Sequence, residues 1–248
     1  MDVLNPKHIE SFALELAKGN IPSHSGVNKF GFNDAVGTSF ETIWTVGGLY
    51  TWLDSAQLLV VVGSDVGDDI DVPAGGAHTI EIEGLDVNYN IISETITMQG
   101  LTPVTTVNAY IRVHRARVTT AGDAGGTIGS ILIQDIPRVI SVLEISPDYD
   151  NQSLLTLYTV PAGYTAYMNK VIFSTGKAKE VFCSLNVRPF GGVFNIKHNV
   201  QIRENISTRE FNPCIKIEEK SDIEARAVNL NSGSVEISCE FDLILVKN

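Results

Sequence analysis

The sequence predicts an all-β protein of two antiparallel β-sandwich domains, jelly-roll or immunoglobulin-like, preceded by a short N-terminal helix and an extended arm. Apolar and polar residues alternate along many short segments, such as HTIEIEG and VEISCEF. These segments recur with turn residues between them, which is typical of sandwiches and barrels. No long helical pattern lies between them, which argues against a parallel α/β sheet.

Composition excludes several classes of function. The chain has 248 residues, of which 44% are apolar, and a net charge of −11. No apolar run approaches the ~20 residues that cross a bilayer, and no signal peptide is readable at the N-terminus. An acidic surface repels phosphate backbones. We therefore expect neither membrane insertion nor nucleic-acid binding.

The first segment, residues 1–35, is expected to hold the helix and the arm. In NPKHIESFALELAKGN, Asn5 can cap the helix and Pro6 suits its first position. Apolar residues at spacings of three and four form one stripe, and Gly19 supplies a stop. The following Gly-, Ser- and Asn-rich stretch predicts an extended arm, which we expect to dock with the helix on another subunit.

Residues 36–146 are expected to form the first sandwich. TIWTV and LYTWL flank Gly47 and Gly48, which predicts a hairpin. The further strand segments of this domain are LLVVV, HTIEIEG, IISETIT, YIRVHRARV and SILIQD. The stretch QDIPRVISVLEISPDYDNQ contains two prolines, and we place the domain boundary in it, near Pro147.

Residues 147–248 are expected to form the second sandwich. About seven strand segments fit into this length, the density typical of one such domain. The last of them, Val235 to Val246, has the pattern of a central strand. VPAG occurs twice, at Val72–Gly75 and Val160–Gly163, but its surroundings differ. The two copies therefore indicate the same kind of turn at a strand end and no duplication.

The acidic loop GSDVGDDIDV is the one candidate metal site. Asp65, Asp68, Asp69 and Asp71 supply oxygen ligands of the kind that calcium prefers. Their spacing misses the EF-hand pattern, so a solvated loop is favoured and calcium stays an alternative. The histidines are scattered and form no zinc motif. We expect no metal and no cofactor.

No residue is assigned a catalytic role. Cys183, Cys214 and Cys239 show no CxxC spacing and are expected to be buried, small hydrophobes in a reducing compartment, with a Cys183–Cys239 disulfide as an alternative. The carboxylate pairs Glu81/Glu83 and Glu218/Glu219 suggest no pocket. RPFGGVF predicts a hairpin tip at Gly191–Gly192, and the basic strand YIRVHRARV predicts ion pairs between subunits.

Several stretches resemble a poorly characterised group of tailed-bacteriophage proteins, many from marine phages. The most specific are IEGLDVNYN with SETIT, the second VPAG with the Tyr-Thr-Ala-Tyr that follows, and the closing EFDLILV. The resemblance covers nearly the whole chain from about Phe30. It implies a component of the virion rather than an enzyme, assembled in the host cytoplasm, and it carries over no functional residue.

The expected function is therefore that of a non-enzymatic structural protein of the phage particle. It would be a capsid decoration or a head–tail or tail accessory that contacts other virion proteins and forms a homo-oligomer such as a trimer. The alternative is a receptor- or glycan-binding tail fibre or tip module, for which Tyr164, Tyr167, Phe190 and Phe194 are the aromatic candidates. An enzyme such as a depolymerase would need close carboxylates in a cleft or a β-helix repeat.

Overall fold

The computed structural model describes residues 11–149 and 151–248, and it is almost entirely β, as predicted. The elements are α1 (Phe12–Ala17), β1 (His24–Val36), β2 (Glu41–Thr42), β3 (Leu59–Gly63), β4 (Ala77–Leu85), β5 (Ile91–Thr97), β6 (Val104–Thr105), β7 (Arg112–Ala121), β8 (Ile131–Asp135), β9 (Ser141–Ile145), β10 (Leu157–Thr159), β11 (Tyr164–Ser174), β12 (Glu180–Arg188), β13 (Asn195–Arg203), β14 (Ile206–Ile217), β15 (Asp222–Asn229) and β16 (Val235–Lys247).

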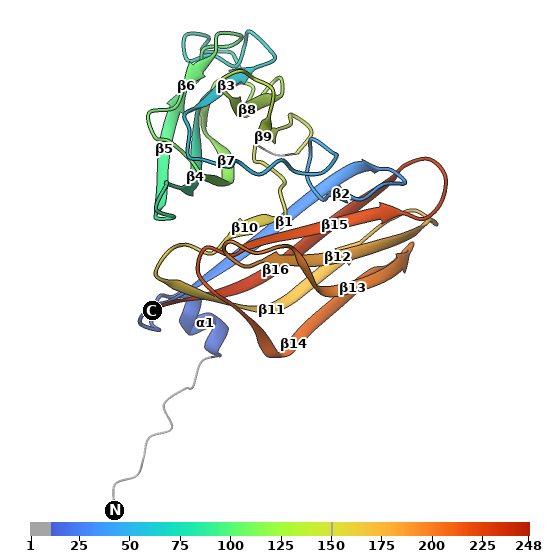
Figure 1. Ribbon diagram of the computed structural model, residues 1–248. Helices are drawn as coiled ribbons and strands as arrows, with labels where there is room; N and C mark the ends of the chain where they lie inside the picture. Colours follow the sequence, from blue (N-terminus) through green and yellow to red (C-terminus); the bar gives the residue numbers. More distant parts are fainter. Residues whose placement is uncertain (1–10, 150) are drawn as a thin grey trace, which may run out of the picture.

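The strands gather into two lobes (Figure 1). The β3–β9 lobe has one sheet in the order β6-β3-β8-β9 and a second in the order β5-β4-β7. The larger lobe, called the C-terminal lobe here, has the sheets β1-β16-β11-β14 and β10-β15-β12-β13, with β2 beside β15. All strand pairs are antiparallel.

Each lobe has its own hydrophobic core. In the C-terminal lobe, Phe173 and Phe241 of one sheet and Leu185 of the other are completely buried in a shared cluster. In the β3–β9 lobe, Ile80 and Ile133 belong to a second cluster, to which residues 44–53 and 155–157 also contribute. Burial alternates along β16 over nearly its whole length, which confirms a central strand between β1 and β11.

The expected arm is wrong for residues 24–36, because these residues form β1. This strand pairs with β16 along its length, from His24 opposite Val246 to Val36 opposite Val235. Glycine in this stretch marks a close approach of backbones rather than flexibility: a Cβ on Gly31 would lie 2.6 Å from the carbonyl oxygen of Ile43. The chain therefore enters the C-terminal lobe before it builds the β3–β9 lobe.

Two further expectations are corrected. The segments on either side of Gly47 and Gly48 form no hairpin ladder. Both glycines have positive φ and make a turn, but only Glu41–Thr42 is a strand here, and it pairs with β15. The stretch expected to be a junction contains β9, residues 141–145, which pairs with β8. The hairpin between β12 and β13 is as predicted. Both VPAG copies lie in turns before a strand, but the turns differ: the first is closed by Gly75 N–H to Val72, the second by Tyr164 N–H to Pro161, and only Gly163 has a positive φ.

The described helix is short. Ser11 caps it by accepting the backbone N–H of Leu14, and Gly19 follows it with φ of 73°. The predicted cap, Asn5, and Pro6 lie outside the described residues. None of the six helical residues is buried, and Phe12 and Leu14 are 53% and 45% exposed.

Candidate functional site

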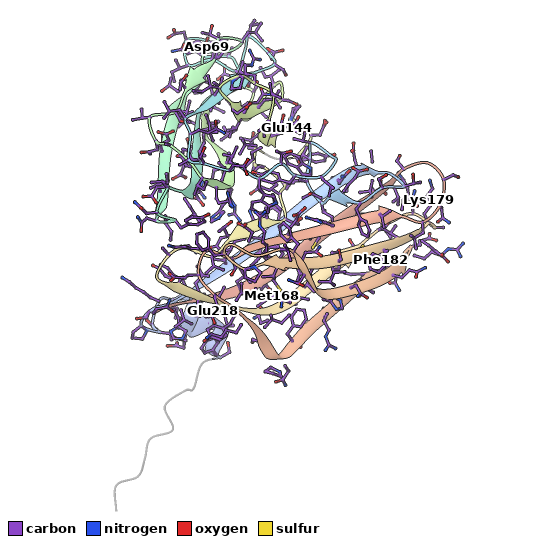
Figure 2. All side chains as sticks on the ribbon, in the orientation of Figure 1. Asp69, Glu144, Met168, Lys179, Phe182 and Glu218 are labelled. Atoms are coloured by element: carbon purple, nitrogen blue, oxygen red, sulfur yellow. The ribbon has the colours of Figure 1, made fainter. Side chains whose placement is uncertain are left out.

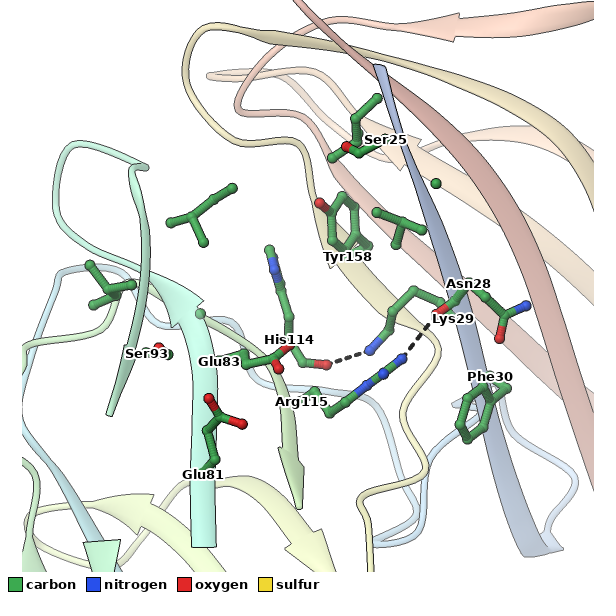
Figure 3. Close-up of a pocket in the computed structure, with 16 residues that line it drawn as sticks. Ser25, Asn28, Lys29, Phe30, Glu81, Glu83, Ser93, His114, Arg115 and Tyr158 are labelled. Atoms are coloured by element: carbon green, nitrogen blue, oxygen red, sulfur yellow. Dashed lines mark hydrogen bonds between the residues drawn. The ribbon is translucent and has the colours of Figure 1, made fainter. Parts of the chain in front are cut away.

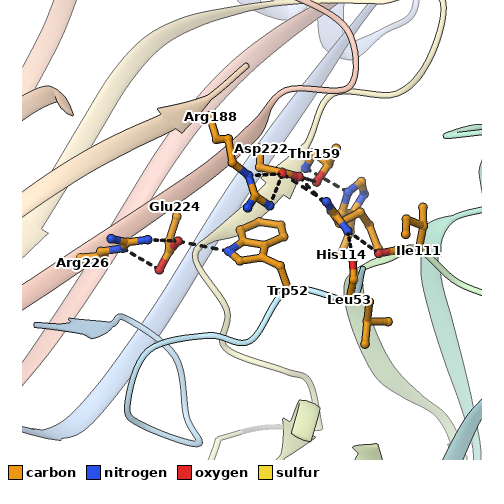
Figure 4. A network of polar contacts seen from close by, with 10 residues as sticks. Trp52, Leu53, Ile111, His114, Thr159, Arg188, Asp222, Glu224 and Arg226 are labelled. Atoms are coloured by element: carbon orange, nitrogen blue, oxygen red, sulfur yellow. Dashed lines mark hydrogen bonds and ion pairs between the residues drawn. The ribbon is translucent and has the colours of Figure 1, made fainter. Parts of the chain in front are cut away.

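The junction between the two lobes contains a buried charge network (Figure 4). Asp222, the first residue of β15, accepts two hydrogen bonds from Arg112 of β7, at 2.8 Å from Nε and 3.2 Å from Nη2. It also accepts Nη2 of Arg188 at 2.6 Å and the hydroxyl of Thr159 at 2.6 Å. One carboxylate is thus shared by two guanidinium groups, one from each lobe.

Glu224 extends this network by one step along β15. It is completely buried and accepts hydrogen bonds from the Thr42 hydroxyl at 2.6 Å, from Arg226 Nη2 at 2.8 Å and from Trp52 Nε1 at 3.3 Å. Asp222 and Glu224 alternate with core residues of the same strand, so the period-2 geometry of β15 directs both carboxylates away from the hydrophobic core.

Trp52 lies between the two arginines. The guanidinium carbons of Arg112 and Arg188 lie 4.9 and 5.0 Å from the centre of its ring, within the range of a cation–π interaction. Arg188 also lies over Phe194, at 4.7 Å. Aromatic faces and charge-assisted hydrogen bonds therefore hold the same arginines, which makes this junction a well-ordered polar contact.

A cavity of about 210 Å³, called the junction pocket here, opens beside this network. Its walls come from three loops, which contribute Trp52, Tyr89 and Phe190, and from Lys220. The Tyr89 and Phe190 rings pack edge to face with centres 5.7 Å apart. The Lys220 ammonium lies 5.7 and 5.5 Å from these two ring centres. Aromatic and cationic groups thus meet at one opening.

Two residues of the junction pocket have strained backbones. Tyr89 and Lys220 adopt left-handed conformations, with φ of 66° and 59°. Side chains with a Cβ disfavour this region, and such strain persists only where the surroundings hold it. Here the Tyr89 carbonyl accepts the N–H of Ala162, and the N–H of Lys220 bonds to Val160. The second VPAG turn therefore fixes both residues.

A larger cleft of about 570 Å³ lies elsewhere between the lobes (Figure 3). Lys29 of β1 donates to the carbonyl oxygen of His114 in β7, and Arg115 Nη2 donates to the carbonyl oxygen of Asn28 at 3.0 Å. Glu83 of β4 lies on the opposite wall. These contacts join the edge strand of the C-terminal lobe to the β3–β9 lobe.

The cleft shifts the ionisation of its residues. Burial, with the positive charge of Arg115 nearby, lowers the pKa of Lys29 to about 7, although Glu83 opposes this shift. Burial lowers the pKa of His114 well below its usual value, and the charges of Lys29 and Arg112 add to the effect. His114 Nε2 accepts the backbone N–H of Thr159 at 3.1 Å, which requires the neutral ring. A neutral His114 is thus part of the joint between the lobes.

A third hollow lies beside the helix and has a volume of about 580 Å³. It is lined by α1, β1 and β16, and Phe12 and Leu16 stand on its helical side. Leu16 packs over Gly26, where an added Cβ would lie 3.7 Å from Leu16 Cδ2. We call the exposed side chains of Phe12 and Leu14, together with this hollow, the α1 groove.

The acidic loop is organised around Asp68, a single completely buried carboxylate. Its oxygens accept the backbone N–H groups of Ala77, Ile128 and Gly129 at 2.8 to 2.9 Å and the Thr127 hydroxyl at 3.1 Å. Loop donors therefore occupy these oxygens. Among the residues that the structure describes, no three His, Cys, Asp or Glu side chains are grouped as metal ligands would be.

The other candidates lie far apart. Asp69 is at the outer end of the β3–β9 lobe, whereas Glu218 lies in the C-terminal lobe on the side of α1 (Figure 2). Glu81 and Glu83 both contact Arg117, with Nη2 at 2.5 and 3.3 Å from their carboxylate oxygens. Glu218 pairs with Lys216. Glu81, Glu83 and Glu218 thus contact neighbouring cations, Glu219 accepts the backbone N–H of Gly163, and the two carboxylate pairs do not converge.

The cysteine expectation is confirmed for two residues. Cys183 and Cys239 are buried free thiols, and burial raises the pKa of Cys183 to about 12 and that of Cys239 well above its ordinary value. The alternative disulfide between them is absent. The prediction is wrong for Cys214, which is exposed. It follows the cis bond between Asn212 and Pro213 on the outer strand β14, where no neighbouring strand covers it.

The described histidines make separate contacts. His24 contacts the carbonyl oxygen of Pro22, and His78 contacts that of Val72. His198 packs edge to face on Phe211. His8 lies outside the described residues.

The basic strand was assigned wrongly to contacts between subunits. Arg112, Arg115 and Arg117 all make contacts within the chain, to Asp222, Asn28 and Glu81. The strand pattern identified the charges, but their partners are 110, 87 and 36 residues away in sequence.

The four aromatic candidates for a receptor or glycan site lie in two different places. Tyr164 and Tyr167 belong to β11, whereas Phe190 and Phe194 flank the hairpin tip and contact Tyr89 and Trp52. Sequence analysis missed the roles of Trp52 and Lys220. Aspartate, arginine and aromatic residues within RPFGGVF and EKSD were visible, but nothing in the sequence joined them.

No helix within residues 11–149 and 151–248 has the length and apolarity that crossing a membrane would require. No protein-family model matches the chain, and no curated protein matches it. Among solved structures, that of the infectious bursal disease virus Gx strain is 10% identical over 99% of this chain and 78% of the other, with a TM-score of 0.23. The crystal structure of the infectious bursal disease virus VP2 subviral particle is 11% identical over 97% and 88%, with a TM-score of 0.16. At these scores the likeness does not define a topology.

Proposed function

We propose that this protein is a non-enzymatic structural component of a tailed-bacteriophage particle that acts through protein–protein contacts as a capsid decoration or a head–tail or tail accessory. The sequence resemblance to phage proteins supports this role. In the same proposal, each lobe is a β-sandwich domain, and the boundaries 36–146 and 147–248 stay predictions. The buried network at Asp222 connects the two lobes, which supports a role as one rigid structural unit.

The observation that carries the proposal is the α1 groove. A helix of six residues is unstable alone in water, so it needs a surface to pack on. Leu16 packs over Gly26 of β1, and Phe12 lines the hollow and is 53% exposed. Leu14 is 45% exposed on another side of the helix. A neighbouring subunit that fills the hollow and extends around the helix would bury apolar area of both exposed side chains. We propose a second copy of the chain in this place, within a closed ring such as a trimer.

The sheet edges support contact through side chains rather than through added strands. The outer strand β14 carries Pro213, which cannot donate to a ladder, and Arg209. The outer strand β13 carries Lys197 and Arg203. Prolines and charges of this kind protect edges from pairing with another sheet. The apolar groove is therefore the better assembly surface.

Sedimentation of a groove variant tests this function. Phe12→Ser with Leu14→Ser is expected to shift the chain from oligomer to monomer and to prevent its incorporation into particles when it replaces the natural protein. Val107→Ser with Val139→Ser changes two even more exposed apolar residues of the β3–β9 lobe and serves as the matched control. Equal sedimentation and incorporation of both variants would refute the proposal.

The second candidate function is recognition of a receptor or glycan. It is favoured by the junction pocket, where Phe190 exposes 64% of its surface beside Lys220. Loop tips that rest on a rigid scaffold often carry binding residues, and here an aromatic ring and a cation stand together at such a tip.

A further inference from the structure

The junction pocket contains hydrogen-bond donors that the protein leaves unused. Within the described part of the chain, the Lys220 ammonium has no acceptor and no ion-pair partner, and its neighbours are the faces of Tyr89 and Phe190. Arg188 donates to Asp222 through Nε and Nη2, while its Nη1 has no acceptor among the same residues. Both groups line the same pocket.

The local charge favours an anion although the chain as a whole is acidic. Arg112, Arg188 and Lys220 line the pocket against Asp54 and Asp222, which leaves one positive charge in excess. The net charge of the chain is −11, so this excess is a local exception. Asp222 is shared by Arg112 and Arg188, so the excess positive charge and the Lys220 ammonium attract an anion.

The size of the pocket favours a small ligand. A volume of about 210 Å³ is below the range of ~300–1,000 Å³ that holds a drug-sized ligand, and it suits a single ring. The Arg112–Asp222 pair among its lining residues is buried and already hydrogen-bonded. The exposed ring of Phe190 stands at the opening and presents an apolar face.

We propose that the junction pocket binds a carboxylate-bearing sugar ring at the end of an acidic saccharide. The carboxylate accepts hydrogen bonds from Lys220 Nζ and Arg188 Nη1. The apolar face of the sugar ring packs on the exposed ring of Phe190. The left-handed backbones at Tyr89 and Lys220 hold both side chains at the opening before the ligand arrives, which lowers the ordering cost of binding. This binding is independent of assembly through the α1 groove.

Fluorescence of the purified full chain tests the site. Trp52 is partly exposed in the pocket, while the only other tryptophan, Trp44, is buried in the core of the β3–β9 lobe. Digalacturonic acid is expected to change the emission in a saturable manner. Its methyl ester keeps the ring and removes the charge, and it is expected to bind at least about tenfold more weakly.

Two variants assign the interaction to its residues. Lys220→Gln removes the charge but keeps a polar side chain one atom shorter, and it is expected to weaken binding of digalacturonic acid about tenfold, and Phe190→Ala about fivefold. Lys177→Gln removes the same charge at the opposite end of β12 and is the matched control, with unchanged affinity expected. Unchanged melting temperatures show that the variants are folded.

The proposal is overturned if digalacturonic acid gives no saturable change or if its ester binds equally well. It is also overturned if Lys177→Gln weakens binding as much as Lys220→Gln does. Tight binding of a hexaglutamate peptide that Lys220→Gln weakens would indicate an acidic protein partner and would refute the proposal of a saccharide ligand. Sedimentation of the α1 groove variants is measured separately, so failure of one proposal does not imply failure of the other.

Discussion

Arg112 and Asp222 lie 110 residues apart in sequence, yet they form a buried bidentate ion pair that joins the two lobes. Their side chains are 9% and 5% exposed. Burying such charges is costly, and the cost is recovered only when every partner is present. Because Asp222 is shared by Arg112 and Arg188, losing the carboxylate and losing one arginine do not have the same cost.

This asymmetry predicts unequal effects of removing either partner. Asp222→Leu leaves two guanidinium groups without their carboxylate and is expected to lower the free energy of unfolding by about 3–5 kcal/mol. Arg112→Met leaves Asp222 paired with Arg188 and is expected to cost less. Urea unfolding measures both. Lys170→Met breaks a more exposed pair with Asp242 and should cost at most about 1 kcal/mol. Equal losses for Asp222→Leu and Arg112→Met would contradict the shared-carboxylate arrangement.

Lys29 predicts a rise of stability with pH. Its pKa in the folded protein is about 7, below the usual 10.5, so between these values the unfolded chain binds more protons than the folded chain. The charge penalty is fully present below pH 7 and disappears as the pH approaches 10.5. Compared with Lys29→Met, the wild type is expected to gain up to about 1.4 kcal/mol per pH unit over this interval. Chemical unfolding at pH 7, 8.5 and 10 measures the gain, and parallel profiles would refute it.

His114 predicts a loss of stability in acid. Burial lowers the pKa of His114 in the folded protein. Below the ordinary pKa of 6.5, this side chain therefore binds a proton in the unfolded chain but stays neutral in the folded chain. Stability should therefore fall as the pH drops below 6.5. His114→Gln is expected to flatten the unfolding profile between pH 6.5 and 5, because glutamine does not titrate. An equally steep profile for wild type and His114→Gln would contradict this role of His114.

The cysteines predict a reactivity order. Cys214 is exposed, while Cys183 and Cys239 are buried and burial raises their pKa values. One thiol per chain is expected to react quickly with a disulfide reagent in the native state, and all three after unfolding. Cys214→Ser should remove the fast phase entirely. A fast phase that survives this change would show that a core thiol is accessible.

Asp68 predicts a structural role for the acidic loop. Asp68→Ala removes the acceptor of three backbone N–H groups and is expected to cost about 3 kcal/mol or more in unfolding free energy. Asp71→Ala, in the same loop but exposed, should change it by less than about 0.5 kcal/mol. Thermal unfolding with and without calcium completes the comparison. A calcium-dependent rise of the melting temperature that Asp68→Ala abolishes would overturn this structural role.

The positions of most strands can be predicted from the sequence, because the alternation of apolar and polar side chains is a local property of each segment. The central position of β16, the hairpin at Gly191–Gly192 and the burial of Cys183 and Cys239 all follow from such local patterns. Local patterns misled where one residue type serves two purposes. The Gly-rich stretch around Gly31 predicts an extended arm, but Gly31 allows β1 to pass close to Ile43.

The contacts between charged and aromatic side chains at the junction depend on the tertiary structure. Asp222 and Glu224 lie in β15 and Arg112 lies in β7. Trp52 lies in a loop, in a segment that the sequence predicts as part of a hairpin. Their meeting depends on how the two lobes are placed, which is set by the packing of whole sheets and not by any neighbour in sequence. The junction pocket and the partners of every basic residue in β7 are therefore properties of the assembled fold.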